Sequence, residues 1–155
     1  MKAKKTIAKR KRKVACPKLP MQRQLPFHHE GRYFDLRAIF DKVNGKYFAK
    51  RLKGYTIVWG RKRSQPPKEY FVFGTIQEED KMIRIHPLLD APFVPGWFLE
   101  YVVYHEMLHA FVPDEYTPGG RRLVHTEAFL ARERKFPHYR KSKRWEDENL
   151  ARFLQ

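Results

Sequence analysis

The stretch VVYHEMLHAF, residues 102–111, decides how this sequence is interpreted. It contains His105-Glu106-Met107-Leu108-His109, in which two histidines stand four residues apart and a glutamate follows the first. On an α-helix, residues i and i+4 lie on the same face, so both imidazoles can reach one divalent ion. Glu106 then projects close enough to take a proton from a water molecule on that ion. The stretch therefore predicts a metal-binding helix.

The residues around this motif are apolar on every side of the predicted helix, which indicates that the helix is buried. Buried His and Glu side chains need partners, because burial of an unpaired polar group is costly. A bound metal is the simplest partner for all three side chains. The alternative is a structural role, in which both histidines bond to the backbone and Glu106 pairs with an arginine.

A catalytic zinc site needs three protein ligands and an open fourth position, so one more donor is expected downstream. We predict that His125 is this ligand, because Pro118, Gly119 and Gly120 let the chain turn back after His109. Glu127 is the competing candidate. We assign loop or surface positions to the other histidines and nearby acids, namely His28, His29, His86, His138, Asp114 and Glu115.

Apolar periodicity predicts an α+β fold in which a small three-stranded sheet packs on helices. The expected helices cover residues 34–52, 96–111, 124–135 and 145–154, and the expected strands cover 55–59, 70–76 and 82–86. Residues 60–68 and the basic stretch around Pro137 are expected to be loops.

The positive charge is concentrated at the N-terminus. The chain carries 33 Lys and Arg residues against 17 Asp and Glu, a net charge of +16, and ten of these cations lie in residues 1–29 without any acid. We therefore predict a disordered basic arm over 1–29 and one folded domain over 30–155. The arm is expected to bind DNA through its phosphates, or else to be a solvated tail. A second basic group, Arg140–Arg144, either serves the same purpose or pairs with Glu146, Asp147 and Glu148.

The single cysteine, Cys16, excludes an internal disulfide and is typical of a reduced intracellular protein. The sequence has no long apolar run, so we expect neither a signal peptide nor contact with a membrane. The expected location is cytoplasmic, associated with the nucleoid in a bacterium or nuclear in a eukaryote.

Four stretches resemble the SprT-like domain, the zinc metallopeptidase module of bacterial SprT proteins and eukaryotic Spartan. They are residues 34–60, RIHPLL at 84–89, YVVYHEMLHAF at 101–111 and HTEAF at 125–129, and the likeness extends from Phe34 to Phe136. The residues that match the family pattern are Asn44, Tyr47, Phe48, Trp59, His105, Glu106, Met107, His109, Ala110, His125 and Phe129. Thr126 replaces the usual glycine, the last aromatic is displaced by one position, and the cysteines of a C-terminal zinc ribbon are absent.

This resemblance implies a zincin-like metallopeptidase core with Zn²⁺ on His105, His109 and His125. It implies that Glu106 acts as the base and then as the acid, and that the substrates are DNA-associated or DNA-crosslinked proteins. Independently, the sheet suggests that an edge strand over 70–76 accepts the backbone of a protein or peptide substrate. For the group that stabilises the oxyanion, Tyr101, Tyr104, His138 and Tyr139 all remain open.

Two other functions remain in view. A metal-dependent nuclease can use the same three histidines and a basic surface. A non-proteolytic nucleic-acid-binding protein with a structural metal is the third possibility, although a closed site of four ligands has no obvious fourth candidate here.

Overall fold

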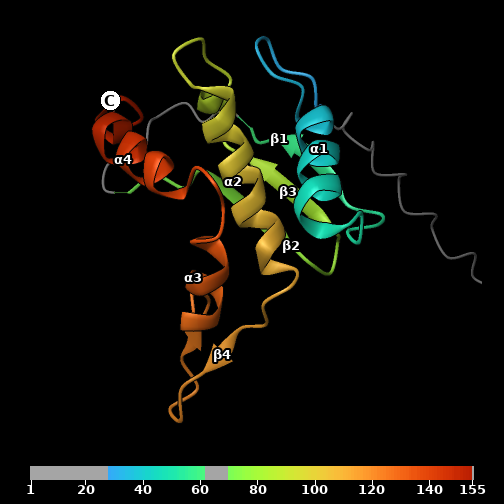
Figure 1. Cartoon of the computed structure of the whole chain (residues 1–155), viewed down its shortest axis with the longest axis vertical. Helices are drawn as coiled ribbons and strands as arrows, with labels where there is room; N and C mark the ends of the chain where they lie inside the picture. The colour runs from blue at the N-terminus through green and yellow to red at the C-terminus, as the bar shows by residue number, and fades with distance from the viewer. Residues whose placement is uncertain (1–27, 62–69, 155) are drawn as a thin grey trace, which may run out of the picture.

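The computed structural model describes residues 28–61 and 70–154. Most of the predicted basic arm and of the predicted 60–68 loop lies outside them. Within the described ranges the chain folds into four α-helices and a mixed three-stranded sheet, which confirms the α+β prediction (Figure 1). The order is α1 (Leu36–Phe48), β1 (Thr56–Trp59), β2 (Gly74–Gln77), β3 (Met82–Ile85), α2 (Gly96–His109), β4 (Glu115–Tyr116), β5 (Arg122–Leu123), α3 (Glu127–Glu133) and α4 (Tyr139–Asn149), with 3₁₀ turns at Pro87–Leu89 and Leu150–Arg152.

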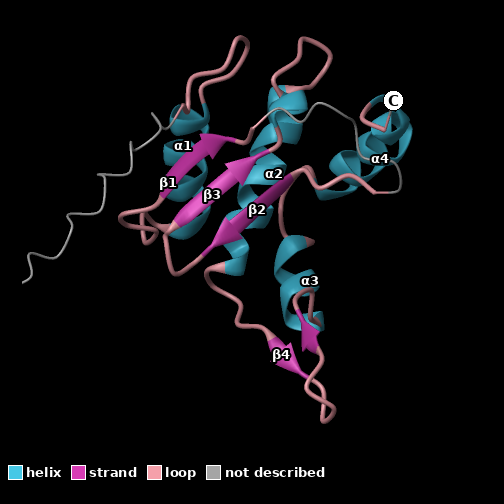
Figure 2. Ribbon diagram, turned by 180° about the vertical axis from the view of Figure 1, so that it is seen from behind, coloured by secondary structure: helices cyan, strands magenta, loops and turns pink. Residues whose placement is uncertain are grey.

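The sheet has the order β1-β3-β2, with β1 parallel and β2 antiparallel to the central strand. Helices α1 and α2 cover the same face of it (Figure 2). Ile57 and Ile83 are paired in register and both are buried, whereas Thr75 of β2 is exposed. This alternation gives the sheet one apolar and one solvated face. Strand β2 lies at an edge.

Helix α1 begins where the carboxylate of Asp35 accepts hydrogen bonds from the N–H groups of Arg37 and Ala38. It buries an apolar stripe that includes Phe40 and Val43. The helix ends at Phe48, before the predicted end at residue 52, because Ala49 takes a left-handed conformation. The amide of the buried Asn44 then bonds both the N–H and the C=O of Leu52, which ties the following turn to the helix.

Helix α2 is the centre of the molecule, with the sheet, α1, α3 and α4 packed around it. Pro95 precedes it and presets the backbone for its first turn. Phe98, Leu99, Val103 and Met107 have no measurable exposure, so the prediction of a buried helix is confirmed.

Other predicted boundaries are also wrong. Helix α3 begins at Glu127 and not at 124, because the Thr126 hydroxyl accepts the N–H of Phe129 and caps the helix there. The basic stretch 139–144 is helical and belongs to α4, whose inward face holds Ser142 and Trp145. Only Gly74–Gln77 of the predicted 70–76 strand is paired, and the short β4–β5 hairpin was not predicted.

Across the part of the chain that the structure describes, every helix is too short or too polar to cross a lipid bilayer.

Candidate metal site

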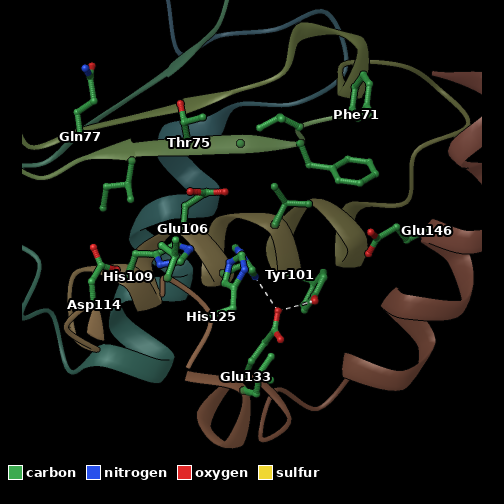
Figure 3. Close-up of a pocket in the computed structure, with 18 of the residues that line it drawn as sticks. Phe71, Thr75, Gln77, Tyr101, Glu106, His109, Asp114, His125, Glu133 and Glu146 are labelled. Atoms are coloured by element: carbon green, nitrogen blue, oxygen red, sulfur yellow. Dashed lines mark hydrogen bonds and ion pairs between the residues drawn. The ribbon is translucent and has the colours of Figure 1, made fainter. Parts of the chain in front are cut away.

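Three imidazoles converge at the C-terminal end of α2 (Figure 3). His105 and His109 come from the last turns of this helix, and His125 comes from the segment just before α3. One ligand atom of each lies within 4.8 Å of the others, and the Nε2 atoms of His105 and His125 are 3.1 Å apart. Nitrogen ligands around a tetrahedral zinc ion stand about 3.3 Å apart, given Zn–N bonds of about 2.0 Å. The cluster could therefore hold a metal ion.

The local fold brings His125 back to the helix. The β4–β5 hairpin reverses the chain after α2, and the Thr126 cap fixes the start of α3. Phe129 is fully buried and its ring stacks on His109 with centroids 4.4 Å apart, while the ring of His125 lies 4.9 Å away. Phe129 thus supports the imidazoles from one side and anchors this segment in the core.

Burial favours the uncharged form of His109 and His125. It lowers the pKa of His109 to about 4, and the neighbouring His105 and His125 act in the same direction. Burial, followed by the proximity of His105, also lowers the pKa of His125. A neutral imidazole has a free nitrogen lone pair, which is the form that binds a metal.

Glu133 holds His105 from behind. Its Oε1 lies 2.6 Å from Nδ1 of His105 and accepts a hydrogen bond of 2.7 Å from the hydroxyl of Tyr101. Burial alone would raise the pKa of Glu133, but the hydrogen bonds from His105 and Tyr101 hold that pKa below its usual value. An ionised carboxylate only accepts, so Nδ1 of His105 donates to it and Nε2 is the nitrogen that a metal could use.

Glu106 occupies a space created by a glycine. A Cβ atom at Gly74 would lie 2.8 Å from Cγ and Oε1 of Glu106, so only glycine lets β2 approach this carboxylate. In Figure 3, Glu106 lies between β2 and the imidazoles. Burial raises the pKa of Glu106 to about 7, although the nearby His105 opposes this rise. The alternative in which Glu106 pairs with an arginine is not supported, since no such ion pair exists among the described residues.

The site opens into a cleft of about 1020 Å³. Strand β2 forms one wall, the hairpin contributes the ion pair of Asp114 and Arg122, and α4 contributes Tyr139, Lys143 and Glu146. The three histidines thus line a cleft that also contains Glu106.

The structure separates the other candidates. Glu127 lies outside the cluster, since its exposed carboxylate pairs with Arg134 at 3.0 Å. The hydroxyl of Tyr101 is used by Glu133 and that of Tyr104 donates to the C=O of Arg132. Tyr139 lines the cleft, whereas His138 precedes α4 outside its lining.

The remaining polar residues have local partners or lie at the surface. His86 accepts the N–H of Leu88 and packs on Phe71, and His29 pairs with Asp35. Asp114 pairs with Arg122 at the rim of the cleft, while Glu115 and His28 are exposed. None of these side chains belongs to the three-histidine cluster.

No family model, curated protein or solved structure matches this chain. The resemblance to the SprT-like family therefore stays a prediction, and the function has to be inferred from the geometry of the site.

Sequence reasoning missed two residues of the site. Gly74 lies within the predicted strand 70–76. A glycine inside a β-branched and aromatic run often indicates that another group approaches the backbone closely, and this signal could have found it. Glu133 could not be recognised as a site residue from the sequence, because it is one of several charged residues in α3. Its burial among them becomes visible only once α3 is packed on α2.

We expect the purified chain to bind one divalent transition metal per molecule, and His125→Ala to weaken that binding more than 100-fold. Changes behind the ligands typically cost about 10- to 100-fold in affinity, so removal of a ligand should cost more. A competition titration with a chromophoric chelator measures this. His138→Ala is the matched control, since His138 lies outside the cluster, and equal affinities for the two variants would contradict the assignment.

We expect Glu133→Gln to lower metal affinity by about 10- to 100-fold, because a neutral amide orients and polarises His105 less well than a carboxylate. The same titration applies. Glu127→Gln, on the outer face of the same helix, should leave the affinity unchanged. A loss with Glu127→Gln but not with Glu133→Gln would reverse the roles of the two glutamates.

Proposed function

We propose that this protein is a zinc-dependent metalloendopeptidase with a zincin-like core of the SprT-like type. The observation that carries the proposal is the convergence of three imidazoles beside a buried carboxylate, in a cleft bordered by an edge strand. Each part has a role in peptide hydrolysis. The alternative structural explanation of the motif does not account for the third histidine.

Zinc is the metal that best suits this donor set. Three imidazole nitrogens without a thiolate are typical of catalytic zinc sites, in which a fourth position stays open. Among the described residues, the cluster includes no fourth ligand. Zinc bound here would supply Lewis acidity, polarising the scissile carbonyl and acidifying a water molecule.

The side chains of the chain itself then perform the proton transfers. Glu106 takes a proton from the attacking water and delivers it to the nitrogen of the leaving amine. Glu133 keeps the proton of His105 on Nδ1 throughout. Of the four candidates for stabilising the developing oxyanion, Tyr101 and Tyr104 donate their hydroxyls to other groups. His138 lies outside the lining of the cleft, whereas Tyr139 lines it, and we assign Tyr139 this role.

The substrate class follows from charge. With a net charge of +16, the protein is attracted to polyanions, and nucleic acid is the commonest of these. We therefore propose that it cleaves proteins bound or crosslinked to DNA. A cytoplasmic location, on the nucleoid of a bacterium or in the nucleus of a eukaryote, belongs to the same proposal.

We expect Glu106→Gln to lower the rate of casein cleavage by about 10²- to 10⁴-fold, because the glutamine has nearly the same shape but cannot take the proton. The zinc content of this variant should equal that of the wild type. Gel analysis of casein and of DNA incubated with both proteins checks the prediction, with Glu127→Gln as the control variant. Cleavage of DNA would favour the nuclease, and cleavage of neither substrate would favour the binding protein.

Strand β2 offers a free edge beside the metal site. The N–H of His86 donates to the C=O of Phe73, and residues of an antiparallel strand alternate in this respect. Thr75 therefore bonds to β3, while the backbone of Gly74 and of Ile76 points away from the sheet. Neither residue forms a backbone hydrogen bond outside the sheet within the described ranges. A substrate backbone can add here as a further strand.

We expect Ile76→Pro to lower kcat/KM for casein by about 2- to 10-fold, the cost of one lost hydrogen bond. Proline removes the outward N–H without breaking the bonds to β3. Ile76→Ala keeps the N–H and is the control for loss of the side chain. Gly74→Pro is a poorer probe, since its ring would contact Glu106. If Ile76→Pro and Ile76→Ala have the same kcat/KM, the substrate does not bind to this edge.

A further inference from the structure

A second concave surface lies on the outer side of α3 and α4. It has a volume of about 540 Å³ and is lined by Arg134, Lys135, Phe136, Pro137, Tyr139 and Arg140. Three of these six side chains are cations, and none is an acid. We call this surface the basic hollow.

The charge of this region is unbalanced. Between Ala128 and Trp145 six cationic residues are exposed, namely Arg132, Arg134, Lys135, Arg140, Lys141 and Arg144. The sole acid in this stretch, Glu133, is buried and its carboxylate is bonded to His105 and Tyr101. Glu133 therefore does not offset the charge of these cations, and Glu127, just before the stretch, pairs with Arg134 alone among them.

The cations of the hollow are available to a ligand. Arg134 contacts Tyr139 and pairs with Glu127, but both members of this pair are largely exposed, so the pair is weak and a phosphate can replace it. Lys135 and Arg140 have no ion pair among the described residues. Arg144 follows Arg140 by one helical turn and extends the same face of α4.

The hollow adjoins the metal cleft. Tyr139 lines both, and the neighbouring residues Glu133 and Arg134 point to different sides, the first into the cleft and the second into the hollow. Helix α4 likewise presents Lys143 and Glu146 to the cleft. A strand bound in the hollow would therefore lie next to the site where a polypeptide is cut.

We propose that the basic hollow, together with Arg144, binds the phosphodiester backbone of a nucleic-acid strand. Evenly spaced phosphates match a row of cations along a helix, and the exposed Pro137 and partly exposed Tyr139 provide a surface for sugars. The inference rests on the proposed function for its choice of partner. Part of the nucleic-acid contact would then lie on the folded domain, in addition to the N-terminal arm.

The test measures binding of the full-length, zinc-loaded chain to labelled single-stranded and double-stranded DNA by fluorescence anisotropy, at salt concentrations from about 50 to 200 mM. Lys135→Glu/Arg140→Glu should weaken binding about tenfold and reduce the salt slope by about two. The matched control is Lys46→Glu/Lys53→Glu, which changes the net charge equally on exposed positions in and after α1. It should weaken binding less than threefold, since only long-range attraction is lost.

Equal losses of DNA affinity in the two double variants would overturn the proposal. Displacement of DNA by polyglutamate at the same concentration of negative charge would also overturn it. Lys135→Gln/Arg140→Gln replaces the first variant if charge reversal lowers the zinc content or the helical circular dichroism. Casein cleavage by the hollow variants should be unchanged. If neither the wild type nor any variant cleaves casein, the peptidase proposal fails. If the hollow variants nevertheless bind DNA more weakly than the wild type, the nucleic-acid site is still supported.

Discussion

The structure depends on one constraint, which is that helix α2 places three polar side chains in a core that is otherwise apolar. His105, Glu106 and His109 lie among residues such as Val103, Met107 and Leu108, which are almost entirely buried. Isolated polar groups in such surroundings would destabilise the fold. The neighbouring elements surround these three side chains. Helix α3 supplies Glu133 to His105 and Phe129 to His109, and β2 supplies the gap at Gly74 that Glu106 fills.

The same constraint explains the arrangement of the hydrogen-bond network around Glu133. The hydroxyl of Tyr101 and the imidazole of His105 both point at one carboxylate oxygen of Glu133. The network is satisfied on its inner side and leaves Nε2 of His105 directed toward the other two imidazoles. A buried network of this kind is stable only when every member has a partner. A bound metal would complete it on the outer side.

The parts of the site that are close in sequence could be predicted. The four-residue spacing of His105 and His109 predicted a shared face, and the Pro-Gly-Gly turn predicted the return of the chain to His125. Contacts between distant segments could not be predicted, because they depend on packing. Gly74 meets Glu106 only after β2 pairs with β3, and Glu133 meets His105 only after α3 docks. The helix over Arg140–Arg144 was missed because its cations conceal the spacing of Ser142 and Trp145, its inward residues.

The central claim is that His105, His109 and His125 bind one zinc ion that keeps an open position. X-ray absorption at the zinc edge tests it most directly. We expect three nitrogen neighbours at about 2.0 Å, all from imidazole, and one oxygen neighbour that a small anionic inhibitor displaces. A spectrum with four protein ligands and no exchangeable neighbour, or with fewer than three imidazoles, would contradict it.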